Sequence, residues 1–226
     1  MKKPLIGIAS CSTYMSDDNI FNDRYYILNN YIKPIIDAGG IPLGILYDED
    51  TIIEENLDLF DGFLITGGTK IIKAHFSIID YCVKNNKPFL GICMGMQALG
   101  VYSMYKEKSI ESVYKNLLLI PDNKIHNIQN TTRNNKEVIA HLVEINQESK
   151  LFDILRKTNI EVNSLHKYNV KNVGEDYLIS AKSEDGVIEA IEIKDKNKFI
   201  IGVEWHPELM PGMSNLFKEF IKFSKQ

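Results

Sequence analysis

Cysteine, arginine and long apolar runs are all scarce in this chain of 226 residues, and each scarcity narrows the class of protein. The three cysteines are an odd and sparse set, so no disulfide framework is expected and a reducing cytoplasm is the simplest setting. No run of about 18 apolar residues occurs, so we expect no transmembrane helix. The apolar stretch after Met1 gives way early to the polar residues 16–18, so no signal peptide is expected either.

The chain also lacks a large excess of positive or negative charge. The formal net charge is −4, which argues against nucleic acid as a partner bound by bulk electrostatics. Only Arg24, Arg133 and Arg156 carry a guanidinium, so a multi-arginine phosphate clamp is not expected. The 44% hydrophobic and 25% charged residues are ordinary globular values, and a chain of this length buries a sizeable core without a disulfide or a metal. We find no repeat or linker and predict a single domain over residues 1–226.

The first half of the chain alternates short apolar runs, typical of buried strands, with helical patterns. The predicted strands span residues 4–9, 41–46, 63–66 and 88–92. The predicted helices span residues 23–38, 73–85 and 95–105, with a short helix or turn at 57–60. Pro34 lies inside the first helix, where it predicts a kink or an early end. This alternation is typical of parallel strands joined by crossover helices.

The second half of the chain is richer in strands. Its predicted strands span residues 141–145, 161–164, 177–181, 187–193 and 199–203, and a helix over 212–225 follows. The turn residues 184–186 predict a hairpin, whereas the polar stretch 109–136 is weakly patterned and predicts no element. The predicted fold class is therefore α/β, with an open, mostly parallel central sheet, flanking helices, and antiparallel strands in the C-terminal half.

A nucleophile turn is predicted where the strand 88–92 runs directly into the next helix. The sequence Gly-Ile-Cys-Met-Gly at 91–95 places Cys93 between two glycines. Small neighbours are needed there because strand and helix approach closely around a strained turn. The thiol would then lie at a helix N-terminus, where the helix dipole favours the thiolate. Taken alone, the motif also fits a buried structural cysteine in a glycine-rich turn.

Two other strand ends carry residues that suit a cysteine nucleophile. His206 follows the strand 199–203 and Glu208 lies two residues later, which fits a general base and the carboxylate that orients it. Gly67 and Gly68 follow the strand 63–66, at the sheet edge where such folds bind ligands. A surface histidine and a plain glycine turn are the alternatives for each motif by itself.

Together, residues 91–97 and 202–208 resemble the class I glutamine amidotransferase-like superfamily, whose fold is flavodoxin-like. The resemblance implies a thiol triad and no cofactor or metal. The implied catalytic residues are Cys93, His206 and Glu208, the implied oxyanion-hole residues are Gly68 and Met94, and the implied γ-glutamyl-binding residues are Gln97 and Gly67. In keeping with this, no His or Cys cluster has the short spacing of a metal site, and no Walker motif occurs.

Three further stretches, 3–8, 25–42 and 162–168, resemble the γ-glutamyl hydrolases, which hydrolyse an amide on the γ-carboxyl of glutamate. The resemblance implies that His166 lies near the active site and contacts substrate, although a purely structural histidine is the alternative. The remaining histidines, His75, His126 and His141, belong to no motif and are predicted to be structural or on the surface. Cys82 and Cys11 are expected to be buried thiols, Cys11 with a place in the pocket as its alternative.

The chain departs from the family pattern just after Gly68. Ile71 and Ile72 stand where the family has an Arg-Asp pair, His75 stands where it has a glutamate, and the loop is shortened. Lys70 and Lys73 make this wall of the pocket more basic. These changes suggest a larger or more acidic leaving group, such as a nucleotide-linked γ-glutamyl conjugate.

The sequence therefore predicts a cytoplasmic cysteine hydrolase that acts on a small γ-glutamyl conjugate and releases glutamate and an amine. Neither nucleic acid nor a membrane is an expected partner, and related folds often form homodimers. One alternative is a glutaminase subunit that supplies ammonia to a separate synthase, since it would use the same triad. Another is a non-catalytic binding module that retains the fold.

Overall fold

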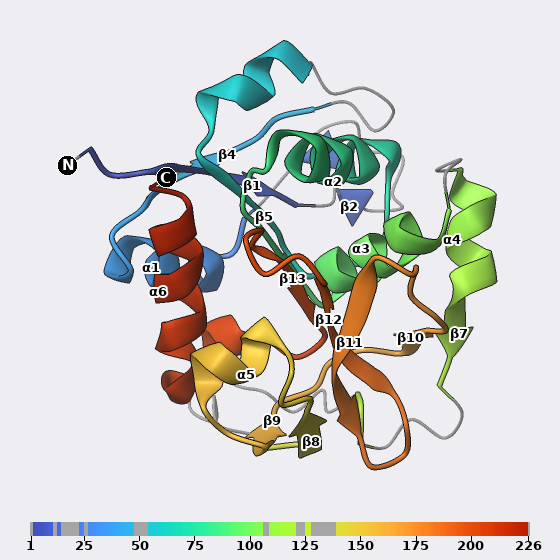
Figure 1. The fold of residues 1–226 in the computed structure, drawn as a ribbon. Coiled ribbons are helices and arrows are strands. Elements are labelled where there is room, and N and C mark those ends of the chain that lie inside the picture. The colour runs from blue at the N-terminus through green and yellow to red at the C-terminus, as the bar shows by residue number, and fades with distance from the viewer. Residues whose placement is uncertain are drawn as a thin grey trace.

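The computed structural model describes residues 2–10, 13–14, 23–24, 27–47, 54–105, 109–120, 125–127 and 139–225. Its central sheet consists of β1 (Leu5–Ala9), β4 (Ile41–Gly44), β5 (Gly62–Ile65), β6 (Phe89–Ile92), β8 (His141–Ile145), β9 (Asn159–Val162), β11 (Tyr177–Ser183), β12 (Ile188–Ile193) and β13 (Ile200–Val203). The order across the sheet is β4-β1-β5-β6-β13-β12-β11-β8-β9 (Figure 1).

The sheet changes character along its width, as the sequence predicted. From β4 to β13 all neighbouring strands are parallel, whereas from β13 to β9 all are antiparallel. The predicted fold class, a mostly parallel α/β sheet with antiparallel strands in the C-terminal half, is thus confirmed. Because β5, β6 and β13 are parallel neighbours, their carboxyl ends meet at one edge of the sheet.

Helices cover both faces of the sheet. They are α1 (Asn29–Asp37), α2 (Lys73–Asn85), α3 (Met94–Met104), α4 (Ile110–Asn116), α5 (Lys150–Leu155) and α6 (Ser214–Phe223). Short 3-10 helices are η2 (Glu54–Leu59), η3 (Pro207–Leu209) and η4 (Pro211–Met213). Figure 1 shows α1 and α6 together on one side of the sheet and α2 and α3 on the other.

Alternation along the strands builds two cores. Phe63 and Ile65 of β5 lie in the same buried cluster as Phe76 of α2, whereas Leu64 lies in a second cluster with Phe217 of α6. Successive strand side chains point to opposite faces, so one apolar strand feeds both cores. Continuous apolar runs such as the one in β5 are therefore what the two-sided burial requires.

Most predicted elements are present, but one helix starts later than predicted. The helix predicted from residue 23 begins at Asn29, and residues 23–24 form β3 (Asp23–Arg24), which pairs with β2 (Thr13–Tyr14). Leu28 has an extended backbone, with φ of −70° and ψ of 138°, so the helical geometry begins only after it. Of the kink or early end predicted at Pro34, the early end is wrong. The helix continues to Asp37, because a proline in the second turn removes the bond to only one preceding carbonyl.

The structure also contains elements that the sequence did not predict. Two of them, α4 and β7 (Leu117–Leu119), lie in the polar stretch 109–136. The strand β7 pairs with β10 (Tyr168–Val170), outside the central sheet. Such short elements form because they pair with distant parts of the chain. The spacing of apolar residues along the sequence does not reveal that pairing.

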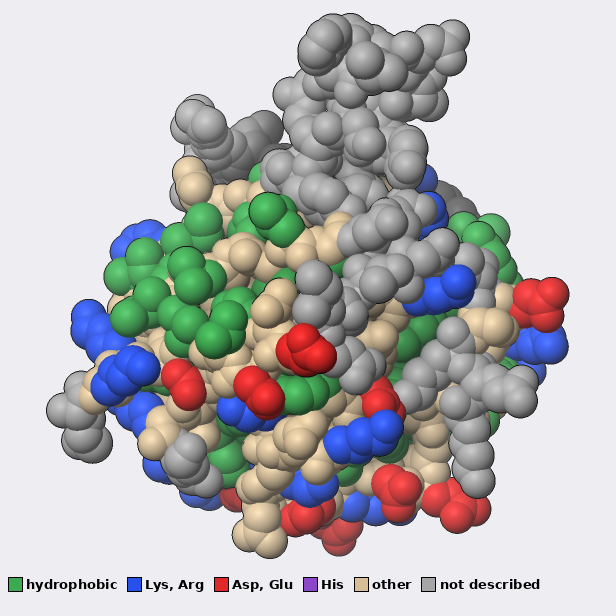
Figure 2. Space-filling model, turned by 90° about the horizontal axis from the view of Figure 1, so that it is seen from above, with side chains coloured by type: hydrophobic (Ala, Val, Ile, Leu, Met, Phe, Trp, Pro, Cys, Tyr) green, Lys and Arg blue, Asp and Glu red, His purple; other side chains and the backbone are tan. Residues whose placement is uncertain are grey.

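The outer surface carries charges of both signs. The face in Figure 2 shows hydrophobic side chains gathered towards one side, with lysine and arginine intermixed with aspartate and glutamate elsewhere. Of the helices described here, none is both long enough and apolar enough to cross a membrane.

Candidate active site

Cys93 occupies a strained turn between β6 and α3. Its φ is +51° and its ψ is −108°, in the positive-φ region that residues other than glycine rarely adopt. The Cys93 N–H donates to the carbonyl oxygen of Val203 at 2.8 Å, and the Cys93 carbonyl accepts from the Gln97 N–H at 3.0 Å. The turn is thus anchored to β13 on one side and to α3 on the other, which is the geometry of a nucleophile elbow.

The two glycines of the elbow are required by space. A Cβ atom on Gly91 would lie 2.6 Å from the carbonyl oxygen of Gly95, and one on Gly95 would overlap the carbonyl oxygen of Ile65. Both obstacles are backbone atoms, which cannot turn away as a side chain would. The Gly-x-Cys-x-Gly spacing therefore reports the close approach of α3 to β5 and β6.

Replacing Gly95 by alanine is expected to lower the free energy of unfolding by about 3 kcal/mol or more, because the new methyl group must displace backbone. Gly212→Ala is the matched control, since a Cβ there meets nothing within 4 Å. Urea unfolding of both variants measures the difference. Equal stability of Gly95→Ala and the wild type would contradict this account of the elbow.

His206 and Glu208 lie where the sequence predicted them. Glu208 Oε1 lies 2.8 Å from His206 Nδ1, so the carboxylate fixes the ring and leaves Nε2 for the thiol side. A Cβ atom on Gly67 would lie 2.9 Å from His206 Cε1 and 3.6 Å from Cys93 Cβ. The turn after β5, the elbow and the His206 ring therefore converge on one small space.

The buried pair gives His206 a basic character. Burial alone would lower the pKa of His206, but the Glu208 carboxylate and the Cys93 sulfur outweigh it, so the pKa lies well above its ordinary value. The Glu208 side chain is only 2% exposed, which strengthens its field at the ring. This arrangement stabilises an imidazolium beside the Cys93 sulfur.

Two residues that the sequence did not single out support this histidine. Asn163 bonds to the backbone of His206 in both directions, accepting its N–H at 2.8 Å and donating to its carbonyl at 3.0 Å. The Tyr31 hydroxyl accepts the N–H of Gly67 at 3.1 Å and lies 3.5 Å from His206 Nδ1. Burial, followed by the charge of Glu208, raises the pKa of Tyr31, which keeps its hydroxyl neutral.

The predicted oxyanion-hole residues lie at the two turns beside the thiol. Met94 is the first residue of α3, so its N–H has no carbonyl partner within the helix. Gly68 lies in the turn after β5 and is exposed, whereas Gly67 before it is half-buried. Both positions suit a developing negative charge, and their role stays a prediction.

Gln97 points away from open solvent. Its amide donates to Glu204 Oε1 at 2.5 Å and to the carbonyl oxygen of Tyr168 at 3.4 Å. Burial raises the pKa of Glu204 to about 7, against the opposing charge of His166. The contact between Gln97 and substrate stays a prediction, and in this structure the amide is held by Glu204.

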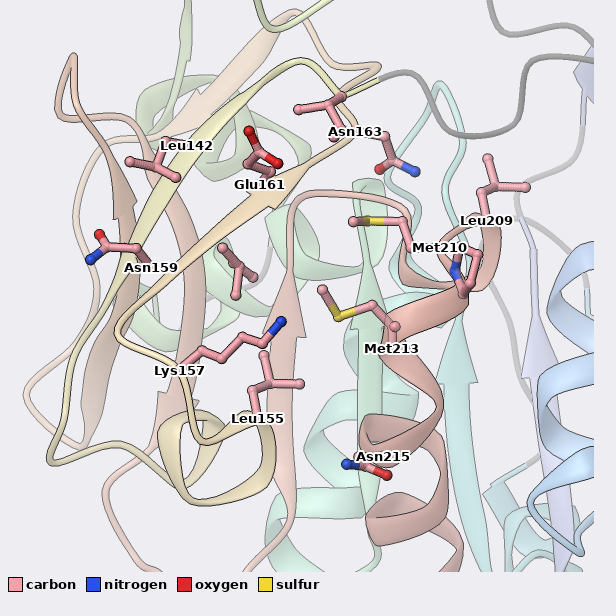
Figure 3. Close-up of a pocket in the computed structure, with 14 residues that line it drawn as sticks. Leu142, Leu155, Lys157, Asn159, Glu161, Asn163, Leu209, Met210, Met213 and Asn215 are labelled. Atoms are coloured by element: carbon pink, nitrogen blue, oxygen red, sulfur yellow. The ribbon is translucent and has the colours of Figure 1, made fainter.

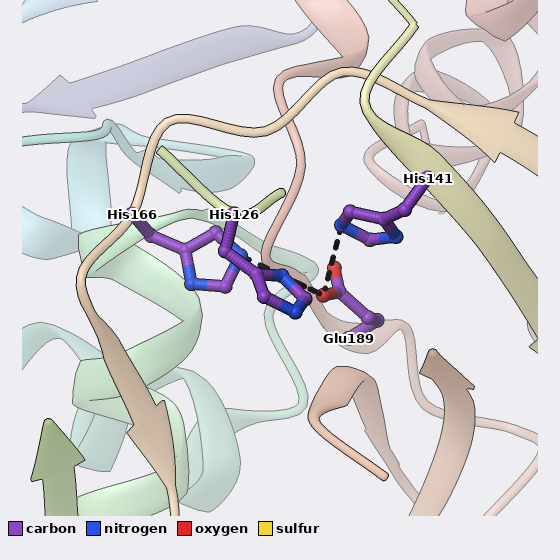
Figure 4. A group of neighbouring side chains, drawn as sticks. All are labelled: His126, His141, His166 and Glu189. Atoms are coloured by element: carbon purple, nitrogen blue, oxygen red, sulfur yellow. Dashed lines mark ion pairs between the residues drawn. The ribbon is translucent and has the colours of Figure 1, made fainter. Parts of the chain in front are cut away.

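His166 is buried and lies among other histidines. It faces Glu189 and Glu204, and His126 and His141 lie next to it (Figure 4). Glu189 and the three histidines form the one group of side chains, among those described, that could hold a metal ion. No sequence signal pointed to this group, because its members are far apart along the chain and lack the short spacing by which metal motifs are found.

The altered wall after Gly68 is partly buried. Ile71, Ile72 and His75 lie in the interior, whereas Lys70 and Lys73 are exposed. His75 Nδ1 accepts the N–H of Ile72 at 3.3 Å, at the start of α2. His75 is therefore structural, as predicted, and it holds this wall through the helix terminus.

His75 should make stability depend on pH. Burial lowers its pKa from 6.5 to about 4. Between these two pH values the imidazole is protonated in the unfolded chain but not in the folded chain. The stability that His75 contributes is complete above pH 6.5 and is lost as the pH falls towards 4, by about 3 kcal/mol. Urea unfolding from pH 7 to 4 should show a shallower decline for His75→Gln. Identical slopes for variant and wild type would contradict the prediction.

A cavity of about 430 Å³ is lined in part by Asn163, the residue that bonds to the His206 backbone (Figure 3). Residues of β9 and of the η3–η4 segment line it, among them Glu161, Leu209, Met210 and Met213. Cys93 does not line this cavity, whereas Asn163 and Leu209, which follows Glu208, do. The predicted pocket place of Cys11 lies outside the described residues.

Comparison with known proteins agrees with this geometry. A glutamine amidotransferase-like protein of Rickettsia prowazekii is 32% identical, with 99% of each chain covered. The γ-glutamyl-γ-aminobutyrate hydrolase PuuD of Escherichia coli is 25% identical, with 92% of this chain and 87% of that protein covered. The solved glutaminase domain of Trypanosoma brucei CTPS, with bound acivicin, matches 98% of this chain and 94% of its own, at a TM-score of 0.68 and 15% identity.

The fold and the strained cysteine turn thus define a class I glutamine amidotransferase-like protein. The family model of Peptidase C26 matches residues 4–77 and 73–208. This chain belongs to the Peptidase C26 family, an assignment that confirms the superfamily and branch predicted from the sequence. Membership makes it an enzyme of the hydrolase or amidotransferase type.

Proposed function

We propose that this enzyme hydrolyses the amide bond of a small γ-glutamyl conjugate and releases glutamate and an amine. The observation that carries the proposal is Cys93 on a positive-φ turn, beside a histidine whose Nδ1 is bonded to a buried carboxylate. A cysteine nucleophile needs these two partners to form and hold its thiolate. The similarity to a γ-glutamyl-γ-aminobutyrate hydrolase supports the choice of bond.

The first half of the reaction forms a thioester. The Cys93 thiolate attacks the γ-carbonyl carbon, and the carbonyl oxygen becomes an oxyanion bound by the N–H groups of Gly68 and Met94, each worth about 3 kcal/mol. The tetrahedral intermediate collapses as the C–N bond breaks. The imidazolium of His206 gives its proton to the departing nitrogen, so the amine leaves neutral.

The second half returns the enzyme to its starting state. Neutral His206 takes a proton from a water molecule, whose oxygen attacks the thioester carbon. Collapse of the second intermediate breaks the C–S bond, releases glutamate and restores the thiolate–imidazolium pair. Glu208 stays ionised throughout and stabilises the imidazolium each time it forms.

The leaving group is proposed to be acidic. Lys70 and Lys73 are exposed, and in the sequence they follow Gly67, where an added Cβ would lie 3.6 Å from Cys93 Cβ. Two lysines in this part of the chain favour a carboxylate or phosphate in the leaving group. A nucleotide-linked or other phosphorylated γ-glutamyl conjugate fits this charge.

A panel of γ-glutamyl amides tests the proposal through glutamate release by the purified enzyme. The panel comprises γ-glutamyl-γ-aminobutyrate, a phosphorylated γ-glutamyl conjugate and free glutamine, each with wild type and with Cys93→Ala. Cleavage of a conjugate by the wild type alone supports the hydrolase, and preference for the phosphorylated one supports the acidic leaving group. Cleavage of glutamine alone, rising when a synthase from the same gene neighbourhood is added, would replace the hydrolase by an ammonia-supplying subunit.

A further inference from the structure

Three histidines and one glutamate outside the thiol triad gather in the interior beside β12 (Figure 4). Glu189 Oε1 lies close to one ring nitrogen of each, at 3.3 Å from His126 Nδ1, 3.4 Å from His141 Nε2 and 3.6 Å from His166 Nε2. None of the four side chains is more than 7% exposed. They come from four separate segments, and the fold alone brings them together.

Each imidazole is oriented through its other ring nitrogen, which faces an oxygen that accepts hydrogen bonds. The three pairs are His126 Nε2 with Asp185 Oδ2 at 2.9 Å, His141 Nδ1 with the Leu142 carbonyl at 3.3 Å, and His166 Nδ1 with the Tyr168 carbonyl at 3.0 Å. With the proton on this outer nitrogen, each ring can offer the lone pair of its inner nitrogen to a cation at the centre of the cluster, as metal-binding histidines do.

Most of the inward atoms face one another at ion-pair distances but make no hydrogen bond. Among the residues that the structure describes, His126 Nδ1, His141 Nε2 and both carboxylate oxygens of Glu189 lack a hydrogen-bond partner. A buried polar atom left in this state costs about 1–3 kcal/mol, and more when it is charged. A single cation between these atoms would satisfy the nitrogens and the carboxylate together.

We propose that His126, His141, His166 and Glu189 bind a zinc ion. Tetrahedral Zn²⁺ with bonds of about 2.0–2.1 Å separates its ligand atoms by about 3.3–3.4 Å. The three nitrogens lie 3.3–3.6 Å from Glu189 Oε1, and all four ligand atoms lie within 4.8 Å of one another. Three imidazoles with one carboxylate suit zinc, whereas calcium and magnesium prefer oxygen ligands throughout.

The zinc would be structural, because four protein ligands leave no open coordination position for a substrate. His126 already lies against the segment that carries His166, since its carbonyl accepts the His166 N–H at 2.7 Å and the Ser164 hydroxyl at 2.8 Å. The ion would join these two segments to β8 and β12. A cluster of four segments would thus become one rigid unit.

This unit adjoins the active site. His166 Nδ1 lies 3.5 Å from Glu204 Oε1, the same oxygen that accepts the hydrogen bond from Gln97 on α3. Glu204 is two residues before His206 on the same chain segment. Zinc would therefore fix the side of the site formed by Gln97, and His166 would serve as a metal ligand in place of the substrate contact implied by the family resemblance.

The test is metal binding by the full chain, with no assay of activity. Protein stripped with EDTA and dialysed is titrated with ZnCl₂ by calorimetry, and with CoCl₂ to record the intense visible absorption of tetrahedral Co²⁺. We expect one ion per chain and a rise in Tm of about 5 °C or more with ZnCl₂. Glu189→Gln and His141→Gln should each weaken binding at least about tenfold. His75→Gln, which alters a buried histidine outside the cluster, should bind like the wild type.

The proposal stands on the wild-type titration even if a cluster variant does not fold. Absence of ZnCl₂ binding by stripped wild-type protein, with no change in Tm, would overturn it and leave a metal-free charge network. Wild-type affinity in both cluster variants would also overturn it, because the ion would then lie elsewhere.

Discussion

Replacing Cys93 by alanine is expected to lower kcat/KM for γ-glutamyl hydrolysis by about 10⁴-fold or more, because no other group can form the thioester. Cys93→Ser should also fall far below the wild type. Its hydroxyl is a much weaker acid than a thiol, and the His206–Glu208 pair is arranged to hold a thiolate. Initial rates of glutamate release measure both losses.

Thiol labelling separates a lost nucleophile from a damaged fold. Cys82 is the matched control, since it is fully buried and burial raises its pKa, so it should be inert. With Cys11 replaced by serine in every variant, iodoacetamide should label the wild type once and Cys82→Ala once, but leave Cys93→Ala unlabelled. Full hydrolysis by a folded Cys93→Ala would rule out the thiol mechanism, whereas no hydrolysis of any γ-glutamyl amide by the wild type would favour the non-catalytic binding module.

Replacing Glu208 by glutamine is expected to have the second largest effect, a fall in kcat/KM of about 10³-fold. Glutamine keeps the shape but removes the charge that holds the pKa of His206 well above its ordinary value. The imidazolium should then lose its proton at lower pH, so the alkaline limb of the pH–rate profile should move down by about one pH unit or more.

Glu161→Gln is the control for this prediction, because Glu161 is exposed and lies outside the triad. Its profile should match that of the wild type. An alkaline limb that stays in place in Glu208→Gln, even with reduced activity, would mean that Glu208 supports His206 by position alone. Unchanged activity would remove Glu208 from the mechanism.

The elements nearest the active site were the best predicted. The bounds of α2 agree with the prediction, and β6 and α3 lie within a residue of it. These are long or fully buried segments, in which apolar periodicity is set by the core on both sides of the sheet. The start of α1 and the short elements α4, β7 and β10 were missed, because pairing with distant segments decided them.

The positions of the candidate catalytic residues were predictable for a similar reason. Cys93 directly follows the buried strand β6 and His206 lies three residues after β13, while Gly91 and Gly95 record a close approach of backbone that no other residue allows. Asn163 and Tyr31 gave no such signal, since any polar residue in a loop or helix looks alike until its partner is known. Their contacts to His206 and Gly67 exist only in the folded chain.

Some features of this protein follow from the sequence alone, and others follow only from the tertiary structure. The sequence alone indicated a cysteine nucleophile at a strand end and no disulfide framework, because a nucleophile elbow is a local motif of five residues. Only the tertiary structure decided that His126, His141, His166 and Glu189 share one buried space. Metal motifs are visible in a sequence when neighbouring residues supply the ligands. Here the ligands come from four segments, so only the packing of the sheet could bring them together.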